Sequence, residues 1–289
     1  MWKNYFKIAI RNLSKNKLHT GINLIGLTLG LGVSILIFFF VQFELSFDDF
    51  HEQSGQIFRV ERHQVDEEGD HASFSTPIIT APTFASEFSQ VKYTTRMIGS
   101  SAQAFLDEQT TQNQTFLMVS PDFLEVFSFK LLQGAKDKVL QDKFGVVITE
   151  EVAKKYFGDA NPIGKSIRMR MGDNFEEYQV SGLLEDLPAN SSIQFEMLMN
   201  DQNLDFSVGK ESQTSWFNVY GDTYLKLNEG QSKASVEAGV EAMMKKVLGE
   251  EYEEGKYLFT LQPIAEMHLS EISQPWRLVV RLPGRKKWE

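Results

Sequence analysis

The chain contains no cysteine among its 289 residues. This absence excludes disulfide bonds, metal sites built on thiolates and catalysis by a cysteine nucleophile. A domain outside the cell without disulfides is ordinary in bacteria, whereas secreted eukaryotic domains are commonly cross-linked. The composition therefore favours a bacterial protein over a secreted eukaryotic one.

Acidic residues are missing from the first twenty positions, although the chain has 39 of them and only 29 basic residues. Positively charged flanks stay on the cytoplasmic side of a membrane, so this asymmetry predicts a cytoplasmic N-terminus and an outside location for the rest. The strongly acidic remainder argues against nucleic acid as a partner, because phosphate binding needs a basic face. The basic residues that would set the topology are Lys3, Lys7, Arg11, Lys15 and Lys17.

Charge is absent from residues 24–43, and the uncharged run extends back to Thr20. A helix of about 20 residues spans roughly 30 Å, the thickness of the hydrocarbon core of a bilayer. Two alternatives are a buried core helix and a cleaved signal peptide, but core helices seldom stay uncharged so long and no small-residue cleavage site follows. We therefore expect a retained transmembrane helix over 20–43. The next most apolar runs, at 145–148 and 278–280, are only as long as a strand.

Recognisable catalytic motifs are also lacking. The five histidines show no His-Glu-x-x-His pair, and there is no Gly-x-Ser-x-Gly elbow. His63 and His71 could face each other across a hairpin near Asp66, Glu67 and Asp70, which makes a weak metal-site candidate; the alternative is a solvated polar turn. We expect no catalytic residue, no cofactor and no metal, and hence no enzyme.

The stretch from Gly158 to Ser166 superficially resembles a phosphate-binding loop. The motif requires four residues between its glycines, and here five separate Gly158 from Gly164. The stretch is also expected to follow a helix and lead into a strand, whereas a phosphate-binding loop follows a strand and opens a helix. We interpret it as a helix end and turn.

Residues 1–18 are expected to form an amphipathic helix within a cytoplasmic segment, 1–19. Trp2, Phe6, Ala9 and Leu13 fall on one stripe, opposite the basic residues. Such a helix suits the cytoplasmic headgroup layer, although a short tail that only sets topology is an alternative. Within the span, Gly26, Gly30 and Ser34 recur every four residues, a spacing that lets two helix backbones approach closely in lipid.

The remainder is predicted to be an α+β domain of split βαβ type with a smaller, mostly β, subdomain inserted into it. Strands are expected over 57–65, 91–98, 193–199, 223–227 and 257–263, and helices over 77–88 and 232–248. The middle is expected to contain strands over 115–119, 127–132 and 145–148, a short helix from Thr149 to Gly158, and a hairpin over 165–184. The predicted division is 44–98 with 189–270, the insertion at 99–188, and an atypical tail at 271–289.

The sequence resembles the permease subunits of MacB-type and FtsX-like ABC transporters, and most closely the N-terminal half of the long permeases of Bacteroidetes. The resemblance covers roughly 1–270, and its motifs occur in one order. The matching stretches are 4–13, 22–27, 43–48, 57–60, 123–127, 147–150, 154–165, 180–188 and 261–269.

The resemblance implies a porter-like periplasmic core domain with an inserted subdomain, held in the bacterial inner membrane and without enzymatic chemistry. It also implies as partners a cytoplasmic ABC ATPase, other permease helices in a dimer, and a periplasmic adaptor protein. The family continues into further membrane helices, which the tail at 271–289 cannot form, so we expect a fragment or truncated form. The alternative function is a bitopic sensor or adaptor that binds a ligand or protein outside the cell membrane.

Overall fold

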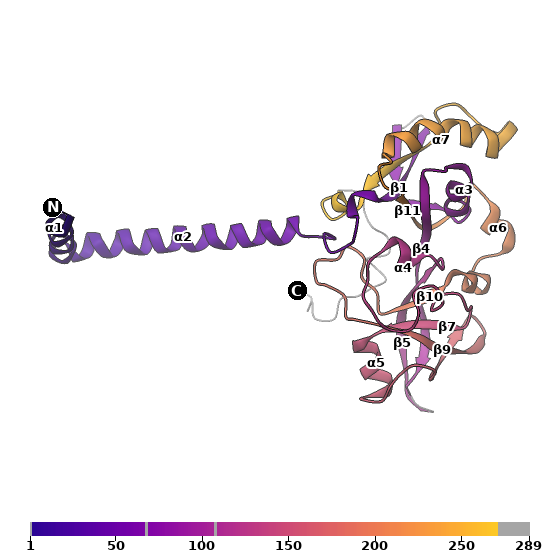
Figure 1. Cartoon of the computed structure of the whole chain (residues 1–289), viewed down its shortest axis with the longest axis horizontal. Helices are drawn as coiled ribbons and strands as arrows, with labels where there is room; N and C mark the ends of the chain where they lie inside the picture. Colours follow the sequence, from indigo (N-terminus) through magenta and orange to yellow (C-terminus); the bar gives the residue numbers. More distant parts are fainter. Residues whose placement is uncertain (1, 67–68, 107–108, 271–289) are drawn as a thin grey trace. The chain divides into compact units, whose positions relative to one another are not determined.

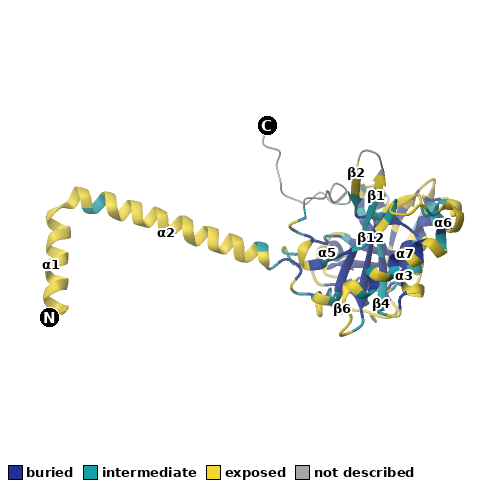
Figure 2. Ribbon diagram, turned by 90° about the horizontal axis from the view of Figure 1, so that it is seen from above, coloured by how far each residue is buried: buried dark blue, intermediate teal, exposed yellow. Residues whose placement is uncertain are grey.

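The structure is a computed structural model that describes residues 2–66, 69–106 and 109–270. It divides into two compact units, Met1–Phe47 and Asp48–Glu289. The first unit contains the helices α1 (Trp2–Lys15) and α2 (Lys17–Leu45), which match the amphipathic helix and the apolar span expected from the sequence. Among the described residues, α2 is the one helix long and apolar enough to cross a membrane. Neither helix buries a residue (Figure 2).

The second unit is built on one sheet, to which all its described strands belong. The path through the sheet is β12-β1-β11-β4-β5-β10-β7-β9-β6, with β2, β3 and β8 paired beside it. The strands are β1 (Ile57–Asp66), β2 (Gly69–Ser73), β3 (Ser75–Pro77), β4 (Val91–Phe105), β5 (Thr111–Val119), β6 (Leu131–Gln133), β7 (Gly145–Thr149), β8 (Ser166–Met171), β9 (Asn174–Leu184), β10 (Met197–Asn200), β11 (Val219–Leu227) and β12 (Tyr257–Pro263).

Helices cover the sheet at both ends of this path (Figure 1). α3 packs against β4 and β11, α7 against β12, and α5 against β7 and β9. The structure confirms two helices that the sequence predicts. α7 has the expected buried face, and α5 has Thr149 as its N-cap and ends at Gly158. The helical segments are α3 (Thr80–Glu87), α4 (Phe123–Val126), α5 (Glu150–Phe157), α6 (Lys210–Thr214), α7 (Lys233–Leu248), η1 (Ser54–Gln56), η2 (Asp201–Phe206), η3 (Gly249–Glu251) and η4 (Ile264–Glu266).

The long strand β4 connects the two parts of the sheet. Its first half pairs with β11, from Val91 to Met97, and its second half pairs with β5, from Met97 to Phe105. β4 therefore passes straight through the expected subdomain boundary at 98. β10 follows the expected boundary at 188 and pairs with β5 and β7. The mixed α+β class is confirmed, and the division into subdomains stays a prediction.

Two expected strands differ from the structure. The strand predicted over 193–199 is restricted to β10, because the residues just before it are held by local side-chain bonds: the Gln194 amide donates to the carbonyl oxygens of Pro188 and Ser191. The strand predicted over 127–132 is reduced to β6, and the one-turn helix α4 precedes it. α4 forms because Phe123, Leu124 and Val126 are all buried by one helical turn.

A fully buried arginine lies inside the first part of the sheet. Arg59 on β1 is 0% exposed; its Nη2 donates to Oε1 of Gln262 at 2.7 Å, and its Nη1 lies 3.7 Å from Oδ2 of Asp222. The guanidinium carbon is 3.2 Å from the centroid of the Phe74 ring. Because an unpaired charge in such a place is costly, this group ties β1, β11 and β12 to one another.

Candidate functional site in the junction segment

Residues 48–56, which we call the junction segment, connect the apolar helix unit in sequence to strand β1. Asp48 has a φ of 61° and Gln53 a φ of 58°, and within the described residues no other non-glycine residue has a positive φ. Left-handed backbone costs free energy in residues with a Cβ, so the surrounding contacts must hold it in place. The segment is therefore a fixed turn.

Asp48 anchors the segment to the loop before β10. Its backbone N–H donates to the carbonyl oxygen of Asn190 at 3.0 Å, and its Oδ1 accepts the backbone N–H of Ser192 at 2.8 Å. The Ser191 hydroxyl lies 3.5 Å from the same oxygen. Asp48 is 1% exposed, and burial raises the pKa of its carboxyl, while the bonds from Ser192 act in the opposite direction.

His51 anchors the segment to a second loop, after α4. Its Nδ1 accepts the backbone N–H of Ser128 at 3.1 Å, and the backbone N–H of Glu52 donates to the Ser128 hydroxyl at 2.8 Å. The imidazole packs among the rings of Phe50, Phe127 and Phe129. Burial lowers the pKa of His51 to about 4, and the nearby Lys226 adds to this. The ring is therefore neutral, with its proton on Nε2.

The junction segment is bound by two separate loops of the sheet unit. The loops at 128 and at 190–192 are far apart in the sequence. Both form hydrogen bonds with residues 48–52, which follow the apolar helix in the sequence by only a few positions. Asp48 Oδ1 and His51 Nδ1 accept backbone N–H groups, whereas Asp48 Oδ2 and His51 Nε2 are buried and make no hydrogen bond within the described residues. The segment presents no nucleophile paired with a base.

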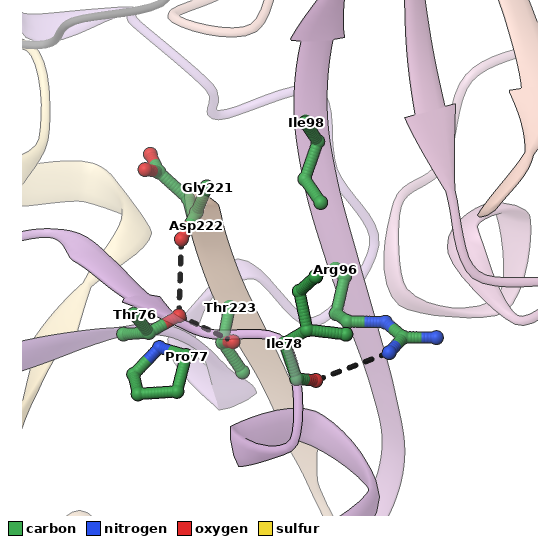
Figure 3. A pocket seen from close by; sticks show the side chains of 8 residues that line it. All are labelled: Thr76, Pro77, Ile78, Arg96, Ile98, Gly221, Asp222 and Thr223. Atoms are coloured by element: carbon green, nitrogen blue, oxygen red, sulfur yellow. Dashed lines mark hydrogen bonds between the residues drawn. The ribbon is translucent and has the colours of Figure 1, made fainter. Parts of the chain in front are cut away.

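A second polar cluster joins β3, β4, β5 and η2. Arg96 on β4 donates from Nη1 to the carbonyl oxygen of Ile78 at 3.1 Å (Figure 3). Its Nε and Nη2 both donate to Asp201. The Ser120 hydroxyl donates to the same Asp201 carboxylate at 2.8 Å. The pocket beside Arg96, between Thr76 and Gly221, has no room for a water-sized molecule. This cluster therefore supports the sheet and offers no ligand site.

The small residues of the span lie along one side of α2. No atom comes within 4 Å of a Cβ built on Gly26 or Gly30, and the Ser34 hydroxyl donates to the carbonyl oxygen of Gly30 at 2.8 Å. Within the described residues of this chain, no other helix packs against them. Their role in helix packing stays a prediction.

The basic residues expected to set topology are all exposed. Lys3, Lys7, Arg11 and Lys15 lie on α1, and Lys17 begins α2. None of these five side chains forms an ion pair within the described residues, so their charges are available to groups outside the chain. The orientation across a membrane stays a prediction.

The amides around Gly164 are already bonded within the protein. The N–H of Ile163 is bonded to the side chain of Asn161, that of Gly164 to the carbonyl oxygen of Val180, and that of Lys165 to the carbonyl oxygen of Pro162. The stretch follows α5 and leads into β8, as the sequence predicts. Its geometry is that of a helix end and turn.

The described residues of the histidine hairpin bind one another and Thr260. His63 Nδ1 lies 3.0 Å from Asp70 Oδ2, and its Nε2 lies 3.0 Å from the Thr260 hydroxyl. His71 pairs in register with Gln64 on the neighbouring strand, and Glu67 lies outside the described residues. Across the described part of the chain, no group of three or more His, Asp or Glu residues is arranged to hold a metal.

The junction residues Asp48 and His51 were not predicted as functional from the sequence. The available signal was the run Phe-Asp-Asp-Phe-His at 47–51, where polar side chains alternate with aromatic ones directly after a span. That pattern indicates a packed interfacial segment, but it does not reveal the partner loops. The tail at 271–289 lies outside the described residues.

A family model described as MacB-like periplasmic core domain matches residues 20–243. A solved domain of a permease protein from Porphyromonas gingivalis is 26% identical and has a TM-score of 0.61, with 72% of this chain and 89% of that one covered. The periplasmic region of MacB from Actinobacillus actinomycetemcomitans is 16% identical at a TM-score of 0.49, covering 73% of this chain and 91% of that one. The extracellular domain of the ABC-type transporter YknZ from Gram-positive bacteria is 14% identical at a TM-score of 0.47, covering 71% of this chain and 99% of that one. No curated protein matches the chain.

Proposed function

Because the chain belongs to the family of proteins with a MacB-like periplasmic core domain, we propose that it acts as a permease subunit of a MacB-type, FtsX-like ABC transporter. In this proposal α2 anchors the chain in the bacterial inner membrane, with the N-terminus in the cytoplasm and the sheet unit in the periplasm. The charge asymmetry around α2 supports this orientation. The sheet unit works by being moved and by contacting substrate or partner proteins.

The junction segment is the observation that carries the proposal. A pull along the span would reach the sheet unit first at Asp48, whose carboxylate and amide bind the loop at 190–192. It would reach the loop at Ser128 through His51 and Glu52. The bond from Ser192 to Asp48 is buried, and a hydrogen bond in such a low-dielectric interior is stronger than one in water. We therefore expect a displacement of the chain at Asp48 to reach both loops of the sheet unit.

The partners follow from the same proposal. A cytoplasmic ABC ATPase supplies the energy, and a second permease supplies the helices that pack on the face formed by Gly26, Gly30 and Ser34. A periplasmic adaptor protein is a further partner of the sheet unit. No chemistry is assigned to the chain itself, because its polar clusters are used for structure.

The test is to purify the full chain in mild detergent from membranes of the source bacterium and to identify what accompanies it. An ABC ATPase should be retained. The native chain has no cysteine, so a single spin label at Lys138→Cys can report the distance between two copies. That distance should change when ATP is added and hydrolysis is trapped with vanadate.

The matched variants are Asp48→Ala, in the junction, and Asp49→Ala, its exposed neighbour. Asp48→Ala should retain the ATPase but lose the nucleotide-dependent distance change, and Asp49→Ala should behave like the wild type. Absence of any ABC ATPase in the preparation, or an unchanged distance in the wild type, would refute the proposed function.

A further inference from the structure

The two helices of the first unit meet in an elbow at Asn16, and a groove runs along its inner side. Polar side chains from both helices line it: Asn12, Asn16, His19 and Asn23. Leu24 and Leu27 continue the lining along α2. The spacing explains this arrangement, because positions 16, 19, 23 and 27 follow one face of a helix.

The polar residues of the groove are not used within the protein. Within the described residues, the side chains of Asn12, Asn16, His19 and Asn23 make no hydrogen bond, whereas the Thr20 hydroxyl is occupied by the carbonyl oxygen of Leu13 at 2.9 Å. Amide groups at the edge of a hydrocarbon layer are costly unless a partner satisfies them. All four side chains are exposed in the chain itself, so three amides and one imidazole in this groove are free to donate to an occupant that accepts hydrogen bonds.

The order of side chains along the groove matches an amphiphile. The amides and the imidazole lie around the elbow, and along α2 the lining becomes aliphatic at Leu24, inside the uncharged run of the span. A phospholipid has the same order, with phosphate and ester oxygens above an acyl chain. A free phosphate would not use the aliphatic part.

The charge around the elbow selects the headgroup. Lys15 and Lys17 flank Asn16 directly, and the first twenty residues contain no carboxylate. Basic residues close to a membrane surface favour anionic lipids. We propose that the elbow between α1 and α2 binds the headgroup of an anionic phospholipid, with its phosphate at the polar residues and an acyl chain along Leu24 and Leu27. This inference rests on the proposed function, because it requires α2 to span the membrane.

The experiment uses the full chain reconstituted in membranes, with spin-labelled phosphatidylglycerol and phosphatidylcholine as probes at pH 8. The wild type should retain phosphatidylglycerol several-fold more strongly than phosphatidylcholine in the motionally restricted fraction. The triple variant Asn16→Leu, His19→Leu and Asn23→Leu keeps every lysine and arginine. Its ratio of retained phosphatidylglycerol to retained phosphatidylcholine should nevertheless fall close to one. The control Asn4→Leu with Gln42→Leu alters amides outside the groove and should keep the preference.

The remaining outcomes separate the possible failures. If the triple variant keeps the wild-type preference and Lys15→Gln with Lys17→Gln removes it, diffuse positive charge explains the binding and the groove proposal is overturned. A wild type that holds both lipids equally overturns it as well, since the groove is then filled by something else, such as a partner helix. If neither lipid shows a restricted fraction, the chain does not insert, and the proposed function fails with it.

Discussion

The guanidinium of Arg96 and a single oxygen of Asp201 are joined by two hydrogen bonds, from Nε to Oδ2 at 3.0 Å and from Nη2 to Oδ2 at 2.5 Å. Asp201 is 6% exposed, and Arg96 is 22% exposed. The pair links β4, in the middle of the sheet, with η2, which follows β10. It connects residues that are 105 positions apart.

Removing the carboxylate should be strongly destabilising. In Asp201→Ala the Arg96 charge stays half-buried without its partner, and we expect the free energy of unfolding to fall by about 3 kcal/mol. Urea unfolding of the full chain in detergent measures this. Glu185→Ala, which breaks the exposed pair with Lys130, should cost less than about 1 kcal/mol. Equal losses of unfolding free energy in the two variants would show that the Arg96–Asp201 pair stabilises the fold no more than an exposed ion pair does.

Gly221 is expected to tolerate no side chain. It lies at an irregularity of β11, and a Cβ there would lie against the carbonyl oxygen of Met97 and the side chain of Ile98. Gly221→Ala should lower the free energy of unfolding by roughly 1–3 kcal/mol, because backbone would have to move. Gly209→Ala is the control: its φ is −61° and nothing lies within 4 Å of the added Cβ. A Gly221→Ala chain as stable as this control would refute the prediction.

His51 should make the stability of the sheet unit depend on pH. Its folded pKa of about 4 lies below the value of 6.5 for an exposed histidine. Above about pH 6.5 both states hold the ring neutral and its full contribution is present. As the pH falls from 6.5 towards 4, the unfolded chain takes up a proton that the folded chain does not, so stability is lost at up to about 1.4 kcal/mol per pH unit.

His51→Gln removes this titration while retaining a hydrogen-bond acceptor for Ser128. The difference in unfolding free energy between wild type and variant should shrink steadily below pH 6.5. Asp48 acts in the opposite direction at lower pH, because its raised folded pKa makes the folded chain the better proton binder there. A difference that is constant between pH 5 and pH 7.5 would contradict the lowered pKa of His51.

Gly30 should matter for association between chains and not for folding of this one. A Cβ at Gly30 meets nothing within 4 Å in the chain, so Gly30→Leu leaves the fold intact. In a membrane-helix dimerisation reporter it should weaken association, since a large side chain holds the neighbouring backbone away. Leu31→Ile, on another face, should leave the signal unchanged. If both variants associate as strongly as the wild type, the small-residue face is not an interface.

Regular elements with a local cause could be predicted from the sequence. Helix α5 has its N-cap, charges and terminal glycine within ten residues, and the Thr149 side chain accepts the N–H of Val152 as expected. α7 carries an apolar face over four turns, and β8 alternates strictly between exposed and buried residues. Each of these signals lies inside the element that it specifies.

Features with a distant cause could not be predicted in the same way. The loop before β10 makes a bond that no local pattern shows, because Asp48, 144 positions earlier, accepts the N–H of Ser192. α4 has only four residues, too few for helical periodicity to be read. The junction segment was visible as a mixture of acidic and aromatic residues, but its partner Ser128 was not.

The pairing of β1 with β12 has a consequence for the order of synthesis. Phe58 is in register with Pro263, so the first strand of the sheet receives this neighbour from almost the far end of the described chain. A ribosome adds about 5–20 residues per second, and the roughly 200 residues in between therefore take on the order of 10–40 seconds to make. During that interval one edge of β1 has no β12 to bind and is available to any other extended chain. Slow translation between the codons for 66 and 257 should lengthen that exposure, and a chaperone that covers extended segments should be needed most when this region is being made.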